Sequence, residues 1–523
     1  MKERSKIARA ASIVSASTLL SRLAGLARDQ VTAYFFGSSF VADAFFMAFR
    51  IPNLLRRLLA EGALTVAFVP VFTETREKDG KAAAGELFRN MFGLLALVLT
   101  AVCALGLIFA PQIVAVMAPG FKGNAEQFQL TIFLTRVLFP YIFFMGLCAV
   151  FMGALNSAGR FAAPALGPFV CNLAMILAAA VLSPRLQRPI LGLAIGALAG
   201  GALQLAIQLP SLARAGLPLA PGANFRSPAI KKILLLMGPA ALGAAVYQLS
   251  VFINSILASK LPEGSVSLLY YADRLMQFPL GIFTMAIGSA ALPALARQSA
   301  QGDRAGFIDS ARFALGLSFF ITIPAAVGLS VLAEPLVTFL FQRGSFSAQS
   351  ALGTAAALQA FALGLPFLSG AGILARIFYS RADTKTPAKA AAICLMAGTL
   401  MAFLLMHPFK HVGLALASSL ASLMNFCWLA GLLLIREKDF PALALLKETA
   451  VISLAALLMG AAASPLGRWA MGAADFWTQT LRTLTTVATG VLVYALLAAA
   501  FKTPYLKPLV KRLRRGAAAG GKK

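Results

Sequence analysis

The chain has 523 residues, of which 59% are hydrophobic and only 12% are charged, and its mean hydropathy is +0.81. Soluble domains carry about 25% charged residues, so this composition excludes a soluble globular protein and predicts an all-α integral membrane protein. The formal charge of +27 would suggest a nucleic-acid partner in a soluble protein. In a membrane protein, basic loops set the topology instead, so we expect no nucleic-acid partner.

Apolar runs separated by polar residues predict about fourteen transmembrane helices, because about 20 residues are needed to cross a bilayer core. In chain order they lie at residues 8–34, 38–72, 87–117, 128–157, 162–183, 189–211, 229–258, 266–296, 309–341, 350–378, 386–406, 410–435, 447–467 and 479–501. Most Lys and Arg residues of the loops fall on the side that also holds both termini. The positive-inside rule therefore predicts that both termini are cytoplasmic.

The longest polar link in the middle of the chain, residues 214–232, predicts a join between two halves. The expected parts are an N-terminal lobe at 1–220 with helices 1–6, a C-terminal lobe at 221–440 with helices 7–12, helices 13–14 at 441–505, and a basic cytoplasmic tail at 506–523. A short echo between residues 67–70 and 290–293, each ending in Pro, supports an internal repeat of the kind found in transporters.

The first predicted span carries charges where charges are costly. Arg22 and Arg28 lie six residues apart, with Gly25 between them to allow a bend or a close approach, and Asp29 follows directly. An Arg or Asp at the centre of a membrane helix costs about 2.5–3.5 kcal/mol on insertion scales. We therefore expect the two arginines to line an interior cavity, with Asp29 available for charge pairing.

The second predicted span is also charged. Asp43 and Arg50 are seven residues apart, which places them on one helix face. Arg56 and Arg57 follow Pro52, and Arg57 and Glu61 have the spacing of a helical ion pair. An interfacial position near the cytoplasm is the alternative interpretation for Arg56 and Arg57.

The eighth span opens with Asp273 and Arg274. Arginines without an equal number of intramembrane carboxylates leave net positive charge in the interior, so an anion is needed to complete it. Arg suits phosphate because its planar donors bind two oxygens at once, and diphosphate is the natural candidate.

Catalytic motifs and nucleotide-binding loops do not occur in the sequence, so we predict a transporter without a cofactor rather than an enzyme. A sodium ion or the membrane potential would then supply the energy. Asn254, Asp383 and Thr399 offer oxygen ligands for a small cation. The alternative for Asp383 is that it caps the following helix, because the turn Thr384–Pro387 comes next.

At these same residues the sequence resembles the MurJ/MviN family of lipid II flippases. The segments that carry the resemblance are Ser21–Asp29, Asp43–Arg57 followed by Glu61, Tyr270–Pro279 and Phe378–Pro387. The likeness runs through about residue 505, and the first two segments together are highly specific.

The resemblance implies the fold of the multidrug/oligosaccharidyl-lipid/polysaccharide exporters. That fold has two pseudo-symmetric lobes around a central cationic cavity, and here two extra C-terminal helices would form a groove for a polyprenyl tail. By matching position, Arg22, Arg28 and Arg274 would bind the diphosphate head group, with Arg56 as a companion. The matching residues for gating or charge pairing are Asp29, Asp43, Arg57, Glu61 and Asp273. Asn254 stands where relatives that bind sodium are expected to have an acidic residue.

The function implied is the flipping of lipid II, an undecaprenyl-diphosphate-linked peptidoglycan precursor, from the inner to the outer leaflet of the bacterial cytoplasmic membrane. It would proceed by alternating access and serve cell-wall synthesis, with membrane lipid and other wall-synthesis proteins as further partners. Three alternatives remain: a flippase for another polyprenyl-linked glycan, a cation-coupled drug exporter of the same fold, and a membrane scaffold. Excess Arg disfavours the drug exporter, because a cationic cavity repels lipophilic cations.

Overall fold

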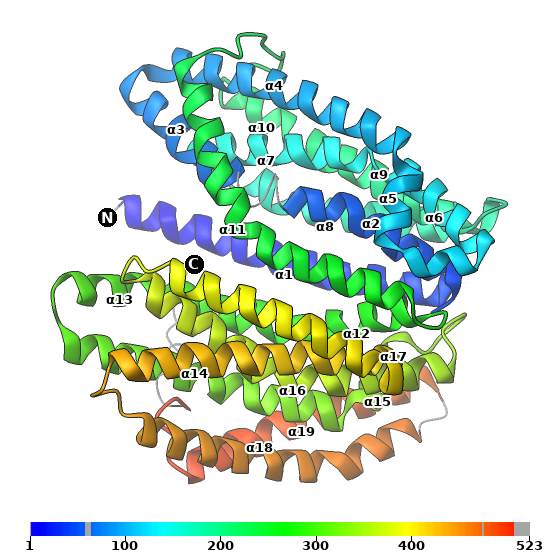
Figure 1. Cartoon of the computed structure of the whole chain (residues 1–523), viewed down its shortest axis with the longest axis vertical. Helices are drawn as coiled ribbons and strands as arrows, with labels where there is room; N and C mark the ends of the chain where they lie inside the picture. Colours follow the sequence, from blue (N-terminus) through cyan, green and yellow to red (C-terminus); the bar gives the residue numbers. More distant parts are fainter. Residues whose placement is uncertain (1, 58–63, 473–474, 507–523) are drawn as a thin grey trace. The chain divides into compact units, whose positions relative to one another are not determined.

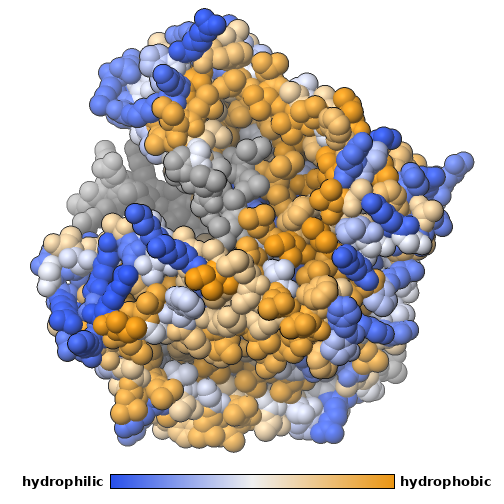
Figure 2. All heavy atoms as spheres, viewed as in Figure 1, coloured by the Kyte–Doolittle hydropathy of each residue, from blue (hydrophilic) through white to orange (hydrophobic). Residues whose placement is uncertain are grey.

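The computed structural model describes residues 2–57, 64–472 and 475–506. Nearly all of these residues are helical and no β-strand occurs among them, in agreement with the predicted all-α class. Within these ranges, nine helices are long and apolar enough to cross a membrane. Hydrophobic side chains cover the middle lengths of the helices, and hydrophilic ones gather towards their ends (Figure 2).

The chain forms two compact units. The first comprises Met1–Ser267 and Arg343–Phe346, and the second comprises Leu268–Gln342 and Ser347–Lys523. The lobe boundary predicted at residues 220 and 221 stays a prediction, because compactness in one conformation and internal repetition are separate properties.

The first unit contains the helices from α1 to α11 and the start of α12 (Figure 1). Their bounds are α1 Lys2–Phe36, α2 Phe40–Arg56, α3 Thr65–Lys78, α4 Gly80–Ile108, α5 Ala110–Met117, η2 Pro119–Gly123, α6 Ala125–Leu138, α7 Tyr141–Ser157, α8 Ala162–Val181, η3 Ser183–Arg185, α9 Ile190–Ala206, α10 Leu209–Arg214 and α11 Pro228–Ser259.

The second unit contains the rest of α12 and all later helices (Figure 1). Their bounds are α12 Ser265–Pro279, the π-helical turn η4 Leu280–Thr284, α13 Met285–Ala300, α14 Arg304–Val331, α15 Ala333–Phe341, α16 Ala348–Tyr379, α17 Lys385–Arg436, α18 Ala442–Met471 and α19 Phe476–Ala500.

Proline and local hydrogen bonding divide several of the predicted spans. The third predicted span is split at Phe109, the residue before α5, whose second residue is Pro111, and the fourth is split at Pro140, before α7. Proline lacks the N–H that continues a helix and is tolerated at its first turn. Several helices also begin at side-chain caps of the residue types that favour this position, such as Asp303 before α14 and Ser347 before α16.

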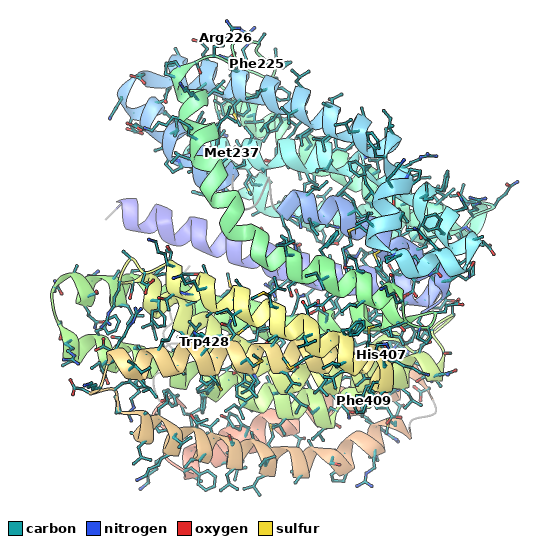
Figure 3. All side chains as sticks on the ribbon, viewed as in Figure 1. Phe225, Arg226, Met237, His407, Phe409 and Trp428 are labelled. Atoms are coloured by element: carbon teal, nitrogen blue, oxygen red, sulfur yellow. The ribbon has the colours of Figure 1, made fainter. Side chains whose placement is uncertain are left out.

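The 52-residue helix α17 is two antiparallel helices joined at a sharp turn. Lys410 leaves the helical conformation, with φ 50° and ψ −131°. A Cβ on Gly398 would lie 2.8 Å from the Cβ of Ala421, although 23 residues of straight helix span about 35 Å. His407 and Phe409 lie at the turn, and Trp428 lies back along the second half (Figure 3). The break predicted between residues 406 and 410 is therefore confirmed.

Small residues let α8 and α9 pack closely in the first unit. Gly192, Gly196 and Gly200 form a stripe on α9, and a Cβ on Gly200 would lie 2.9 Å from the carbonyl oxygen of Cys171 on α8. Glycines four residues apart allow such backbone contact between membrane helices.

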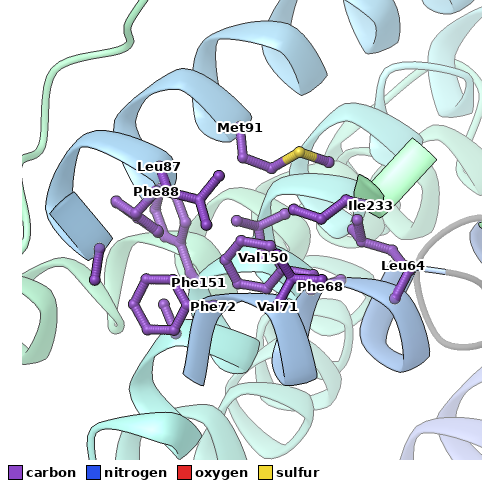
Figure 4. Close-up of a cluster of buried hydrophobic side chains, with 14 of the residues drawn as sticks. Leu64, Phe68, Val71, Phe72, Leu87, Phe88, Met91, Val150, Phe151 and Ile233 are labelled. Atoms are coloured by element: carbon purple, nitrogen blue, oxygen red, sulfur yellow. The ribbon is translucent and has the colours of Figure 1, made fainter. Parts of the chain in front are cut away.

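A second packing centre of the first unit joins α3, α4 and α7. Phe68, Phe72, Phe88 and Phe151 are almost fully buried there (Figure 4), and the rings of Phe88 and Phe151 lie 5.5 Å apart between centroids. Since lipid tails are as apolar as these side chains, close packing rather than exclusion of water stabilises such contacts in a membrane.

Candidate functional site

Arg28 is held in a fixed position within the first unit. Its Nη2 lies 2.6 Å from Oδ1 of Asp29, and its Nη1 donates to Oδ1 of Asn172 on α8 at 3.1 Å. Asn172 in turn donates to the carbonyl oxygen of Ser21, 3.2 Å away. The side chains of Arg28 and Asp29 are only 11% and 1% exposed. The structure thus brings the predicted pair Arg28 and Asp29 together and ties it to a neighbouring helix.

Arg22 has a different environment. It is half-buried on α1, and in the described part of the chain it has no hydrogen-bond or ion-pair partner. Six residues of helix place its side chain about 120° around the axis from Arg28. The helix continues through Gly25 without a break, and a Cβ there would make only an ordinary 3.6 Å contact with Asn172.

Asp43 is a buried acid whose partners are mainly backbone groups. Its carboxylate accepts hydrogen bonds from the N–H of Gly264 at 2.7 Å and of Ser267 at 2.8 Å, and also from the hydroxyl of Ser267. These groups lie at the N-terminus of α12, where free N–H groups favour a negative charge. Glu263 reciprocates by accepting from the N–H of Phe40, which begins α2, at 2.8 Å.

The other charges of α2 lie further along the helix. Arg50, two turns after Asp43, donates to Oγ of Ser255 on α11 at 2.8 Å, so both side chains reach the segment that runs from α11 into α12. Arg56 donates to Oδ1 of Asn53 at 3.1 Å. Arg57 ends the helix and is half-buried. Glu61, its predicted partner, lies outside the described residues.

In the second unit Arg274 folds back on its own helix. Its Nη2 donates to Oη of Tyr270 at 2.8 Å, and the guanidinium lies 5.3 Å from the centroid of that ring. Asp273, its neighbour, accepts a hydrogen bond from the amide of Gln277. Among their contacts, Asp273 and Arg274 therefore each include a hydrogen bond to a residue one turn away on the same helix.

Arg376 is a cation in an apolar helix that the sequence interpretation missed. It lies in the last turn of α16, donates to the carbonyl oxygen of Gly372 at 3.0 Å and contacts Sδ of Met285 at 3.4 Å. The sequence does contain a signal for it, because Arg376 is a charged residue within the predicted span 350–378. A cation near the end of a span is usually assigned to the membrane interface, so this signal is weak.

The predicted cation site is not assembled, which is a correction. Asp383 accepts from the N–H of Thr386 at 2.9 Å and pairs with Arg436 at 2.7 Å, and these contacts hold the pKa of its carboxyl well below its usual range. Thr399 donates to the carbonyl oxygen of Leu395. Sixteen residues separate Asp383 from Thr399, about 24 Å along the helix, so one ion cannot contact both. Asn254 belongs to the first unit.

No other metal site of three or more His, Cys, Asp or Glu residues occurs in the ranges that the structure describes.

A family model for the lipid II flippase MurJ matches residues 32–491. A probable lipid II flippase MurJ of Vibrio cholerae is 38% identical over 424 residues, which cover 80% of this chain and 81% of the relative. The lipid II flippase MurJ of Burkholderia cenocepacia is 38% identical over 421 residues, with 80% and 82% covered.

Solved structures are similar as well. A lipid II flippase MurJ in an inward closed conformation has a TM-score of 0.77 and 28% identity, with 93% of this chain and 98% of that chain covered. An inward-facing multidrug resistance transporter of the MATE family has a TM-score of 0.67 at 17% identity, with 82% and 96% covered. At that identity the second similarity concerns the fold alone.

Proposed function

The chain belongs to the lipid II flippase MurJ family, and we propose that it carries lipid II from the inner to the outer leaflet of the bacterial cytoplasmic membrane. Its extensive similarity to named lipid II flippases is the observation that carries this proposal. The protein is accordingly a multi-pass membrane transporter of cell-wall synthesis and not an enzyme.

The arginines supply the chemistry that such a substrate requires. Arg28 is fixed by Asp29 and Asn172, while Arg22 has no protein partner among the described residues. Guanidinium donors bind pairs of phosphate oxygens. In the proposed cycle a cavity open to the cytoplasm takes up the diphosphate on Arg22, Arg28 and Arg274. The two lobes then rock, and the cavity opens to the other side.

The membrane arrangement is part of the proposal. Fourteen spans form two lobes around a cationic cavity, with both termini in the cytoplasm, because the basic loops fall on the side of the termini. The polyprenyl chain would lie along α18 and α19. In support, leucines such as Leu457 and Leu481 are more than 60% exposed on these two helices, and apolar side chains of this kind match a lipid tail.

The source of energy is also proposed rather than observed. The membrane potential acts directly on a charged head group, by about 2.3 kcal/mol per elementary charge per 100 mV. A sodium gradient is the second source. It requires ligands other than the trio of Asn254, Asp383 and Thr399, because two of those are about 24 Å apart.

The test is the accessibility of lipid II in the outer leaflet after rapid inactivation of the protein in cells. Loss of outward-facing lipid II, with precursor accumulating inside, is the expected result. Arg28→Ala should fail to restore exposure, whereas Arg185→Ala should restore it, because Arg185 is an exposed residue of η3 that donates to the backbone carbonyl of Val181. Unchanged exposure after inactivation would favour another polyprenyl-linked glycan as substrate.

A further inference from the structure

The guanidinium of Arg376 lies between α13 and α16 of the second unit, in a position bounded by Gly288, Met285 and Gly372 that we call the seat. A Cβ built on Gly288 of α13 would lie 2.3 Å from Cζ and 2.4 Å from Nε of Arg376. Even alanine at position 288 would therefore displace the guanidinium. Gly372 lies one turn before Arg376 on α16, and a Cβ there would stand 3.6 Å from Nη1, an ordinary contact. Gly288 thus fixes where the charge of Arg376 lies.

The seat does not neutralise this charge. A guanidinium has five N–H donors, and Arg376 uses them on one carbonyl oxygen of its own helix and one thioether. No carboxylate pairs with it in the described part of the chain. Half-buried guanidinium donors that meet no carboxylate among the described residues are available to bind an anion from outside the protein.

The seat is open on one side. Met285, whose sulfur touches the guanidinium, is 58% exposed, whereas Gly288 is buried. An anion can therefore approach the guanidinium on the side of the flexible Met285, while the backbone at Gly288 packs closely against the arginine.

The position along the helix indicates which anion is near. Arg376 lies three residues before the end of α16, about 5 Å along the axis. The turn that follows carries Arg381 and Lys385, and basic residues of this kind predict the cytoplasmic side. The anion available at that depth is the phosphate of a lipid in the inner leaflet.

We propose that Arg376, held against Gly288, is a further contact for the diphosphate of the lipid-linked substrate and receives it at the cytoplasmic end of the second unit. This inference rests on the proposed function. Undecaprenyl diphosphate and ordinary anionic phospholipids share phosphate chemistry, but a diphosphate offers more oxygens to a planar fork of donors.

The experiment measures binding of two probes to the purified full-length protein in detergent: undecaprenyl diphosphate and phosphatidylglycerol. Gly288→Ala keeps every charge and should displace the guanidinium, and Gly372→Ala is its matched control, because the added Cβ would make only an ordinary 3.6 Å contact with the same arginine. Arg376→Met removes the charge, and Arg376→Lys keeps it as a single point. Thermal unfolding of each variant without lipid confirms that it is folded.

We expect Gly288→Ala and Arg376→Met to weaken binding of undecaprenyl diphosphate about tenfold, which corresponds to about 1.4 kcal/mol. Arg376→Lys should lie between wild type and Arg376→Met, and Gly372→Ala should stay within about twofold of wild type. Binding of phosphatidylglycerol should change less than binding of the diphosphate in every variant.

Three outcomes would overturn the assignment. Equal losses for both lipids would make the seat a general site for anionic lipids. Unchanged diphosphate binding in Gly288→Ala and Arg376→Met would remove Arg376 from the substrate path. If the wild-type protein did not bind undecaprenyl diphosphate at all, the proposed function would fail together with this inference, whereas the first two outcomes leave the proposed function intact.

Discussion

Arg28 in the first unit and Arg376 in the second are both arginines of apolar helices, yet their environments differ. Arg28 meets the carboxylate of Asp29 and the amide oxygen of Asn172, whereas Arg376 meets a backbone carbonyl and a thioether. The first charge is neutralised within the protein, and the second meets no carboxylate among the residues that the structure describes. A paired arginine contributes to the fold and can be pre-oriented for a ligand. An unpaired one is costly until a ligand arrives.

The comparison implies that the two arginines affect stability very differently. Variants of the first should damage the fold and the function together. Variants of the second should damage function while leaving the fold almost unchanged. The following predictions test that difference.

Arg28→Ala has the largest expected effect on stability. It removes the guanidinium that lies 2.6 Å from the carboxylate of Asp29, which is 1% exposed, and breaking a buried ion pair in this way costs about 3–5 kcal/mol. The midpoint of thermal unfolding in detergent should fall markedly.

The double variant Arg28→Ala, Asp29→Asn separates fold from function. Because it removes both charges, most of the lost stability should return, while lipid II exposure in cells should not. If the double variant unfolded as early as Arg28→Ala, the pair would not be the cause of the loss.

Asp43 extends the comparison to an acid of the first unit that is neutralised by backbone groups. Asp43→Ala leaves the N–H groups of Gly264 and Ser267 without their acceptor, which costs about 1–3 kcal/mol. Asp43→Asn keeps one acceptor oxygen and should lose less. Thermal unfolding of the two variants gives the order, and an equal loss in both would mean that burial alone, rather than hydrogen bonding, decides the effect.

These contacts also mark what sequence patterns could predict. Hydropathy predicted the helices, and the break in α17 is confirmed at Lys410. The cost of intramembrane charge pointed to Arg28 and Asp29, which do pair. Periodicity placed Asp43 and Arg50 on one face but could not give their partners Gly264 and Ser255, which are more than 200 residues away.

The missed features have the same physical origin. Gly288 carries no signal of its own, and only the approach of α16 makes it the seat of Arg376. The stripe Gly192, Gly196 and Gly200 was visible as a motif of small residues, but its partner helix was not. The proposed cation site failed because residue types alone do not say that Asp383 and Thr399 stand far apart on one helix. Sequence patterns therefore predicted local structure but not the contacts between residues that lie far apart in the chain.

Arg376→Met tests the other side of the comparison. Since the charge meets no carboxylate in the described ranges, replacing it with an apolar side chain should change the free energy of unfolding by less than about 1 kcal/mol, and in the stabilising direction if in any. Thermal unfolding of the variant beside Arg28→Ala measures this directly. A loss as large as that of Arg28→Ala would mean that Arg376 has a structural role, and the comparison would no longer hold.

The smallest effect concerns charges at the ends of the helices in the second unit. Arg381 and Arg304 pair with Glu437 and hold the pKa of its carboxyl below its usual range. Because the pKa is lower in the folded state than in the unfolded state, the pairs stabilise the fold above the unfolded value of about 4.3. This contribution is lost as the pH falls through the folded value. Glu437→Gln should therefore lower the unfolding midpoint slightly at pH 7 and flatten its decline in acid.

Asp439→Asn is the control for this acid dependence. Asp439 also pairs with Arg304, but its side chain is 68% exposed, and exposed pairs contribute at most about 1 kcal/mol. Unfolding midpoints measured from pH 7 to pH 4 should be almost the same for Asp439→Asn and wild type. If the unfolding midpoint of Glu437→Gln fell as steeply with pH as that of wild type, carboxylates other than Glu437 would cause the loss of stability in acid. The ion pairs of Glu437 would then contribute no more to the free energy of unfolding than Arg376 does.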